Sequence, residues 1–248
     1  MFVGIGIGTE VQPAQRAFSP TQVGDTLLWL DAADPATLFQ TSGGVAASAD
    51  GNPVGSWLDK SGKGNHATNT LTARPTLKVN IYNGRNTVRF DGTNDFLSLP
   101  SIGNLGTIDF TAYVVTKVNT PAAFTVMFEQ SNAGASNRVV FFVGSGSQKY
   151  QYYHNAFVGA GITATSVNRV FKAISNGTNR SFTVDAVTPL SATLADVSTT
   201  GGITYLGNSA YGEYLNGDIC EVIFYSFALS ATQQTIVNTY LKNKWGTP

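Results

Sequence analysis

The chain has 248 residues, with 15 basic and 15 acidic side chains and a formal net charge of zero. This length suffices for one large all-β domain, and the 42% hydrophobic fraction argues against disorder. No stretch gathers Lys and Arg, so we expect neither nucleic-acid binding nor attachment to an anionic membrane.

Residues 1–25 are predicted to form an extended arm. Glycines alternate with Phe2, Val3, Ile5 and Ile7, and prolines further along interrupt any regular element. The segment lacks the basic start and the long apolar run of a signal peptide. An apolar arm of this kind docks either on its own domain or on a neighbouring subunit, and the sequence leaves both open.

Strand patterns follow, bounded mostly by clusters of Gly, Asn, Ser or Pro. They are Leu27–Asp31, Thr87–Asp91, Phe110–Val118, Phe124–Glu129, Arg138–Val143, Tyr150–Phe157, Val170–Ile174, Ser181–Val184, Ile203–Leu206 and Ile219–Phe227. Their spacing is typical of a β-sandwich that spans residues 26–248. In Phe110–Val118 the polar residues fall on alternate positions, which predicts a strand with one face in solvent.

One helix is predicted near the C-terminus. Ser230 and Gln233 form a capping box, and Gly246 is placed to end the helix. We expect the helix to pack an apolar stripe on the sandwich, formed by Ile236, Val237, Tyr240, Leu241 and Trp245.

Three segments carry a family resemblance. Residues 57–66 (WLDKSGKGNH), 88–97 (VRFDGTNDFL) and 215–230 (LNGDICEVIFYSFALS) resemble the laminin-G-like, concanavalin A-like modules of the lectin–glucanase group. The resemblance covers roughly residues 25–246. It implies an all-β fold, a two-sheet antiparallel jelly-roll sandwich with the C-terminal helix and the N-terminal arm as additions.

Members of this family often hold Ca²⁺ near the rim of the sandwich. The matching positions are Asp59 and Asn65 in the first segment, and Asp91, Asn94 and Asp95 in the second. Carboxylate and amide oxygens are the ligands that Ca²⁺ prefers. The same side chains also stabilise tight turns without an ion, so both interpretations stand.

An aromatic strand offers candidate sugar contacts. Within residues 150–157, Tyr150, Tyr152 and His154 share one face, and Tyr153 and Asn155 share the other. Tyrosine rings beside amides suit sugars, since the ring covers apolar C–H groups while the amide bonds to hydroxyls. The candidates are Tyr152, Tyr153 and Asn155; core packing of one face is the alternative.

Catalytic patterns are missing from the sequence. A glucanase of this fold needs paired carboxylates, but the four glutamates (Glu10, Glu129, Glu213 and Glu221) stand apart from other acids at the required spacing. Asp218 and Glu221 would point to opposite faces of a regular strand. Cys220 is expected to be a buried core residue. We therefore expect a protein that is not an enzyme.

The expected function is a non-catalytic decoration or adhesion protein on the surface of a phage particle, with a lectin-like sandwich for host glycans. Its arm would contact neighbouring virion subunits or copies of itself in a homo-oligomer. The alternative is a free carbohydrate-binding module of a bacterial cell-surface or secreted system, and a glycoside hydrolase comes third.

Overall fold

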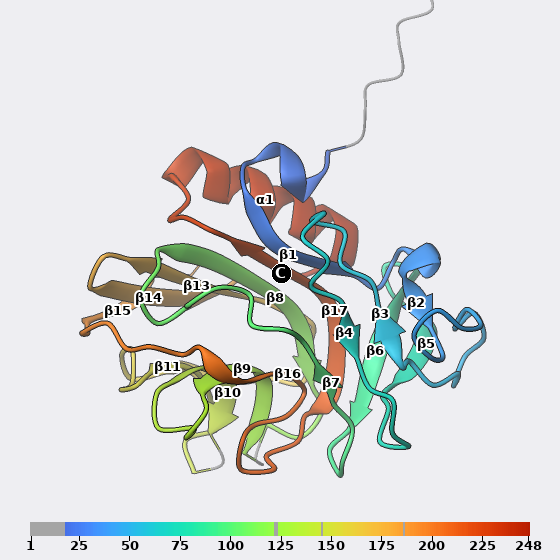
Figure 1. The fold of residues 1–248 in the computed structure, drawn as a ribbon. Coiled ribbons are helices and arrows are strands. Elements are labelled where there is room, and N and C mark those ends of the chain that lie inside the picture. The colour runs from blue at the N-terminus through green and yellow to red at the C-terminus, as the bar shows by residue number, and fades with distance from the viewer. Residues whose placement is uncertain (1–17, 122–123, 145, 186) are drawn as a thin grey trace, which may run out of the picture.

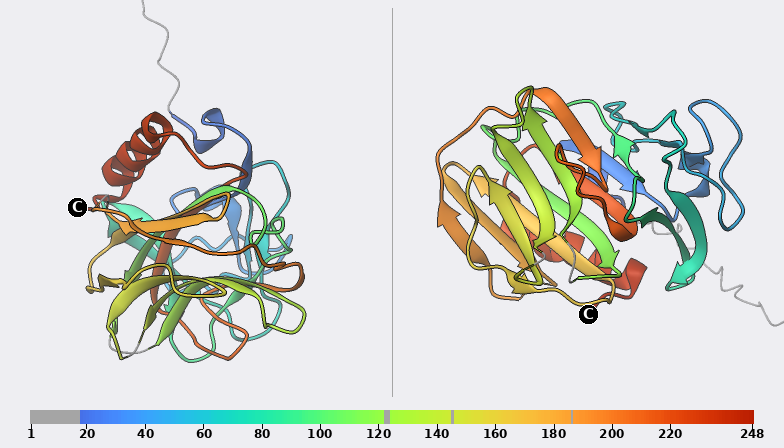
Figure 2. Two further views of the ribbon diagram at one scale, coloured as in Figure 1. Left: turned by 90° about the vertical axis from the view of Figure 1, so that its left-hand side faces the viewer. Right: turned by 90° about the horizontal axis from the view of Figure 1, so that it is seen from below.

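The computed structural model describes residues 18–121, 124–144, 146–185 and 187–248, and it is a sandwich of two antiparallel sheets. A single long helix, α1 (Ala231–Trp245), lies on the outside of one sheet, so the molecule has three layers (Figure 1). The other sheet leaves its outer face uncovered by helices (Figure 2). The all-β sandwich predicted from the sequence is thus confirmed.

The sheet beneath the helix, called sheet A, runs in the order β15-β14-β13-β8-β17-β6-β5, and β1 also pairs with β17. Its strands are β1 (Thr26–Asp31), β5 (Thr76–Tyr82), β6 (Arg85–Asp91), β8 (Phe110–Val118), β13 (Arg169–Asn176), β14 (Asn179–Val184), β15 (Leu190–Thr193) and β17 (Asn216–Tyr225).

The opposite sheet, called sheet B, runs in the order β12-β11-β10-β9-β16-β7-β4-β3-β2. Its strands are β2 (Leu38–Phe39), β3 (Ser56–Trp57), β4 (Ala67–Thr68), β7 (Leu97–Ser98), β9 (Thr125–Asn132), β10 (Arg138–Gly144), β11 (Lys149–His154), β12 (Ile162–Thr163) and β16 (Gly201–Leu206).

Aromatic rings join the two sheets in the core. The ring of Phe141 on β10 lies 5.4 Å from Phe128, 5.0 Å from Phe171 and 6.0 Å from Phe224, measured between centroids. Phe171 and Phe224 come from sheet A, so this contact set spans the sandwich. Large rings bury much apolar area per residue, which is the main source of stability in such a core.

The expectation that β8 has one face in solvent is wrong. All its residues except Lys117 are buried. β8 lies between β13 and β17 in the middle of sheet A, and α1 covers the outer face there. The two threonines of β8 are instead satisfied internally: Thr116 donates to the carbonyl of Asp218, and Thr111 to that of Phe227.

The helix begins and ends where the sequence predicts. Ser230 and Gln233 form the reciprocal capping box, and Gly246 adopts a left-handed conformation at the C-cap. Val237, Leu241 and Trp245 are buried against sheet A, whereas Ile236 remains 44% exposed. The predicted apolar stripe of the helix therefore includes one residue, Ile236, that is not buried.

The arm's expected boundary at residue 25 moves toward the N-terminus. Pro20 is buried within a short 3-10 helix (Pro20–Gln22), and Tyr225 donates a hydrogen bond to its carbonyl. Residues 18–25 therefore belong to the sandwich, and residues 1–17 lie outside the described residues. In the part of the chain that is described, no helix has the length and apolar character needed to cross a membrane.

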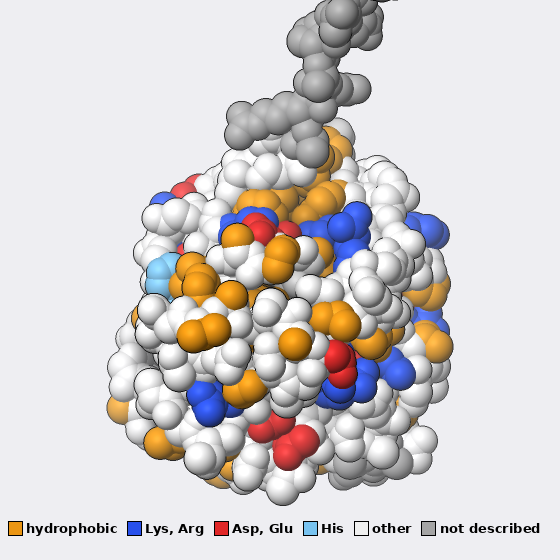
Figure 3. Space-filling view, turned by 90° about the vertical axis from the view of Figure 1, so that its right-hand side faces the viewer, with side chains coloured by type: hydrophobic (Ala, Val, Ile, Leu, Met, Phe, Trp, Pro, Cys, Tyr) orange, Lys and Arg blue, Asp and Glu red, His pale blue; other side chains and the backbone are white. Residues whose placement is uncertain are grey.

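The charged side chains are spread in small groups on the face shown in Figure 3, with acidic and basic residues side by side. This distribution fits the balanced composition of the chain.

Candidate functional site

The first candidate metal turn is closed by its own hydrogen bonds. The Asp59 carboxylate accepts from the backbone amides of Trp29, Ser61 and Asn65 and from the Ser61 hydroxyl, at 2.7–2.9 Å. The Asn65 amide donates to the carbonyl of Leu27. A carboxylate offers about four acceptor positions, and all four are taken here. The contacts tie the turn to β1, and they leave Asp59 no oxygen lone pair for a cation.

The second candidate turn brings two carboxylates together. Asp91 accepts from the amides of Thr93, Asn94 and Asp95, and Asp95 accepts from the amide of Asp91. Partial burial opposes ionisation of Asp91, but the three amides outweigh it and lower its pKa. Burial and the neighbouring Asp91 charge raise the pKa of Asp95 to about 6. The side chain of Asn94 makes no described hydrogen bond here; only its backbone takes part.

The two turns do not form one site. Trp29, bonded to Asp59, lies opposite Ile223 on β17, whereas Asp91 lies opposite Asn216 on the same strand. Seven residues of strand separate these positions, or roughly 23 Å at about 3.3 Å per residue. Within the described ranges, no group of three or more His, Cys, Asp and Glu residues is arranged to hold a metal ion.

Tyr152, one of the predicted sugar contacts, is not accessible to a sugar in the structure. Its ring is fully buried against Phe110 and Phe141, and its hydroxyl contacts the imidazole of His154. Tyr153 and Asn155 do lie on the outer side of sheet B, Tyr153 half-buried and Asn155 exposed. Tyr153 packs edge-on against Phe157, in an apolar cluster with Phe142 and Phe124.

A pocket at the rim of sheet B was missed from the sequence. It has a volume of about 460 Å³ and lies between the β9–β10 turn (residues 131–135) and the β16–β17 loop (residues 208–214). Tyr205 of β16 and Tyr214 line it. Tyr211, in the same loop, is 64% exposed beside it and stacks on the Arg138 guanidinium. We call this the rim pocket.

Two of the residues that line the rim pocket carry a buried polar atom without a hydrogen-bond partner. The Asn208 side-chain oxygen and the Ser131 hydroxyl are buried without a hydrogen bond, and their residues are 6% and 1% exposed. Leaving a buried polar group unpaired costs about 1–3 kcal/mol. Such groups in a concave site mark places where a ligand or an ordered water completes the hydrogen bonding.

Two carboxylates, Glu129 and Glu213, belong to the strand and the loop that supply lining residues of the rim pocket, and one arginine contacts both. Arg138 bonds to Glu129 through two nitrogens and lies 3.8 Å from Glu213. Glu213 also accepts a hydrogen bond of 2.7 Å from Ser209. Glu129 is buried and Glu213 is half-buried. This arrangement holds the 208–214 loop against β10.

The signal for this pocket was present but non-specific. The stretch Gly207–Tyr214 reads GNSAYGEY, which is a turn composition with two tyrosines. Ser131 and Asn132 lie 76 residues or more before Asn208 in the chain. Only the pairing of β9 with β16 brings these segments together, and that long-range pairing is not readable from local spacing.

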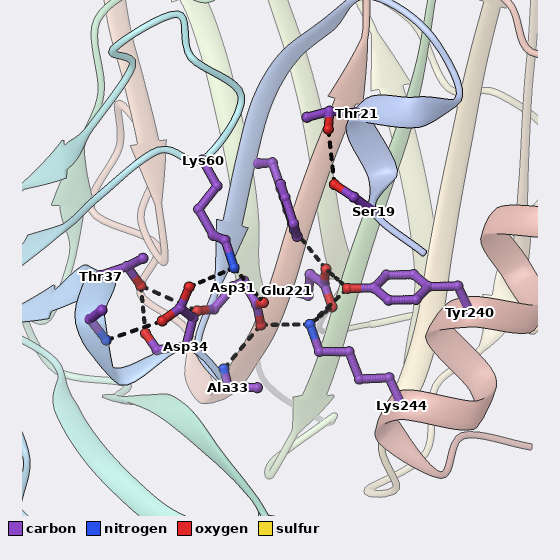
Figure 4. A network of polar contacts seen from close by, with 12 residues as sticks. Ser19, Thr21, Asp31, Ala33, Asp34, Thr37, Lys60, Glu221, Tyr240 and Lys244 are labelled. Carbon is purple, nitrogen blue, oxygen red and sulfur yellow. Dashed lines mark hydrogen bonds and ion pairs between the residues drawn. The ribbon is translucent and has the colours of Figure 1, made fainter. Parts of the chain in front are cut away.

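The sequence predicts that Asp218 and Glu221 lie on opposite faces, provided that their strand is regular. β17 has a register shift between Ile219 and Glu221, so the alternation on which that prediction rests is interrupted. Asp218 forms a two-point ion pair with Arg89 and accepts from Tyr82. Glu221 contacts Tyr240 and Lys244 of α1 (Figure 4). Both carboxylates are thus structural. Cys220 between them is fully buried, as expected, and burial raises the pKa of its thiol.

Comparisons with known proteins support the fold alone. No protein-family model matches the chain, and neither does any curated protein. Among solved structures, a Trypanosoma rangeli sialidase in complex with sialic acid matches with a TM-score of 0.57 at 12% identity, covering 89% of this chain and 33% of the sialidase. This chain thus spans about a third of that protein's length.

Two further structures match over a larger share of their own length. Domain 4 of an extracellular arabinanase from Geobacillus stearothermophilus, in complex with arabinotriose, gives a TM-score of 0.58 at 15% identity, covering 73% of this chain and 91% of the domain. An arabinofuranosidase complexed with arabinofuranosyl-α-1,2-xylobiose gives 0.59 at 12% identity, covering 90% and 64%.

Proposed function

We propose that this protein is a non-catalytic carbohydrate-binding module and that the rim pocket holds a sugar ring. The observation that carries the proposal is a pair of unpartnered polar atoms, Asn208 Oδ1 and Ser131 Oγ, on two residues that line the pocket. Sugar hydroxyls both donate and accept hydrogen bonds, so one ligand can serve both atoms. Most buried polar groups in folded proteins have a partner, which makes two such atoms in one pocket informative.

Aromatic side chains support the same ligand class. Tyr205 and Tyr214 line the pocket, and Tyr211 stands exposed at its edge. Tyrosine presents an apolar ring face with a polar end, which suits the mixed apolar and hydroxylated surface of a sugar. The likeness of the fold to an arabinanase domain in complex with arabinotriose is further support.

The carboxylates favour binding over hydrolysis. A glycosidase needs one carboxyl group that donates a proton and a second that acts as base or nucleophile. Arg138 contacts the carboxylates of both Glu129 and Glu213, and the Ser209 hydroxyl donates a further hydrogen bond to Glu213. Neither carboxylate is left free to face a glycosidic bond. We therefore propose no catalytic residue.

Glycan-array screening followed by calorimetry tests the proposal, with arabinotriose and sialic acid among the probes. Asn208→Ala and Tyr214→Ala should each weaken binding about tenfold or more, because each removes a direct ligand contact. Asn243→Ala on α1, exposed in a different layer, is the matched control and should bind as the unaltered protein does.

Two results would overturn the proposal. One is an array without any bound glycan. The other is full glycan affinity in folded Asn208→Ala and Tyr214→Ala variants. Release of reducing ends from any bound glycan would contradict the non-catalytic part alone.

The setting is a separate part of the proposal. The sequence favours a virion surface over a bacterial cell surface or secreted system, with the N-terminal arm as the contact to a neighbouring subunit. A groove of about 700 Å³ beside Phe18, lined by Ile236 and Tyr240, offers an apolar surface where the described chain begins. Solution mass of the full chain and of a chain lacking residues 1–17 tests this. The arm proposal requires an oligomer that the deletion dissociates; a monomer in both cases contradicts it.

A further inference from the structure

A small pocket lies between α1 and the outer face of sheet A, on a different side of the molecule from the rim pocket. Its volume is about 160 Å³. The residues that matter for its chemistry come from β13 and β14 of the sheet and from the last turns of the helix and the tail: Lys172, Thr183, Asp185, Lys242 and Thr247.

Lys172 is a buried cation without a carboxylate partner. It is 7% exposed, and its ammonium donates one hydrogen bond of 2.8 Å to the Gln234 side chain. Among the described residues it takes part in no ion pair, although four other lysines do. Lysine is almost never buried unless it is paired, because an ammonium loses its hydration there. Burial lowers the pKa of Lys172 for the same reason.

Two hydroxyls in the same pocket also have no partner. Thr183 and Thr247 are 2% and 4% exposed, and neither side-chain oxygen makes a hydrogen bond. Thr183 lies directly opposite Lys172 in the β13–β14 pair. Side chains of directly opposed residues share a face, with Cβ atoms about 5 Å apart. The ammonium and one free hydroxyl therefore belong to the same small space.

The surrounding charges are compatible with an anion. Asp185 also lines the pocket, but its carboxylate is bound by Arg169 at 2.7 Å and by the amide of Val170. Lys242 of α1 adds a further positive charge. Among the side chains, Arg169, Lys172 and Lys242 against Asp185 leave an excess of two positive charges, which the α-carboxylate of Pro248, also at the pocket, reduces to one.

The C-terminus of α1 does not oppose anion binding in this pocket. Exposed carbonyls at a helix C-terminus repel anions. Here the carbonyls of Asn243 and Lys244 accept hydrogen bonds from Asn83, and that of Trp245 accepts one from Asn168. Their lone pairs are therefore partly occupied by protein donors.

We propose that this pocket binds a small oxyanion of the phosphate or sulfate class, held by the Lys172 ammonium and the Thr183 hydroxyl. Thr247 lines the pocket farther away, past the opposite end of α1 from the Gln234 side chain that the ammonium contacts. Such an ion supplies the missing counter-charge and accepts hydrogen bonds through several oxygens. The volume suits an ion of this size, since one water occupies about 30 Å³ of liquid. The site is independent of the proposed glycan site.

Thermal unfolding with inorganic phosphate, at ionic strength held constant with chloride, tests the inference. Phosphate should raise the melting temperature in a saturable manner, because it binds the folded state only. Lys172→Met should abolish this rise. The variant should still fold, since an apolar chain of similar length replaces an unpaired buried charge. Thr183→Val keeps the side-chain shape and should weaken phosphate binding about tenfold.

Lys149→Met, on sheet B, is the matched control and should retain the full effect of phosphate. Crystals soaked in selenate should show an anomalous peak within hydrogen-bonding distance of Lys172 Nζ and Thr183 Oγ1. An equal phosphate effect in Lys172→Met, or no effect at millimolar phosphate, overturns the inference. Sulfate and acetate in parallel separate a tetrahedral oxyanion from a carboxylate as the preferred ligand.

Discussion

The indole of Trp245 donates a hydrogen bond of 2.6 Å to the buried carboxylate of Glu221. This contact joins the last turn of α1 to the central region of sheet A. Trp29 of β1 donates to the other oxygen of the same carboxylate at 2.7 Å, and Tyr240 and Lys244 complete its partners. Glu221 therefore fixes the helix, β1 and β17 relative to one another (Figure 4).

Replacing Glu221 by Gln should lower the free energy of unfolding by about 3 kcal/mol. The amide NH₂ of glutamine would face donors where the carboxylate accepts, and Lys244 would lose one of its two carboxylate partners and keep Asp31. Denaturant unfolding measures the change. Asp50→Asn, which breaks an ion pair at the surface, is the control and should change stability much less than Glu221→Gln does. Equal effects of the two substitutions would contradict the assigned role.

The fold could be predicted from the sequence further than the site could. Continuous apolar runs such as the one in Arg138–Val143, and the Ser230–Gln233 capping box, are local patterns, and the structure confirms both. β5 (Thr76–Tyr82) was missed although Leu77, Val79 and Ile81 alternate with polar residues; it lies at the edge of sheet A, and only Leu77 in it is buried. The rim pocket was missed because Ser131 and Asn208 meet only through strand pairing.

The pair Asp91 and Asp95 predicts an unusual dependence of stability on pH. The pKa of Asp95 rises from 3.8 to about 6, so the folded state holds its proton more tightly than the unfolded chain does. Its contribution is favourable below about pH 4 and is lost as the pH rises through 6. Asp95→Asn should therefore stabilise the protein by about 1–2 kcal/mol at pH 7 and have little effect at pH 4.

Melting temperatures across this pH range check the Asp95 prediction, and Asp50→Asn is the control. The pKa of Asp50 is lowered, chiefly by its hydrogen bond to Lys78, so the control should not stabilise at pH 7.

The same variants test whether the Asp91–Asp95 turn binds Ca²⁺, the interpretation that the sequence left open. Asp59 has no free acceptor, so any Ca²⁺-dependent rise in melting temperature should disappear in Asp95→Asn. A rise that survives in this variant would place the ion elsewhere.

His154 should make stability depend on pH in the opposite direction to Asp95. Burial first, and then the charge of Arg180, lower its pKa from 6.5 to about 4. The folded state therefore resists protonation, and stability should fall as the pH drops from about 6.5 to 4, by roughly 2 kcal/mol. In an Asp95→Asn background this slope should stand alone. Adding His154→Gln should flatten it; an unchanged slope would show that other groups cause the loss.

The last prediction concerns the length of the glycan. Tyr153, Val140, Glu129 and Tyr205 are directly opposed in turn across β11, β10, β9 and β16. Three strand spacings of about 4.8 Å separate Tyr153 from Tyr205, or roughly 14 Å on the outer face of sheet B. A monosaccharide in the rim pocket cannot reach Tyr153, whereas an oligosaccharide lying across the strands can.

Tyr153→Ala should therefore leave the affinity for the shortest bound glycan unchanged and weaken binding of longer members of the same series. The expected loss is about 1 kcal/mol, or roughly fivefold in affinity, for one aromatic contact at a half-buried position. Calorimetry with glycans of increasing length measures it. Tyr205→Ala is the comparison and should weaken all lengths alike, because Tyr205 lines the pocket itself. If Tyr153→Ala also weakened the shortest glycan, the sugar would lie over the Phe142–Phe157 cluster instead of in the rim pocket.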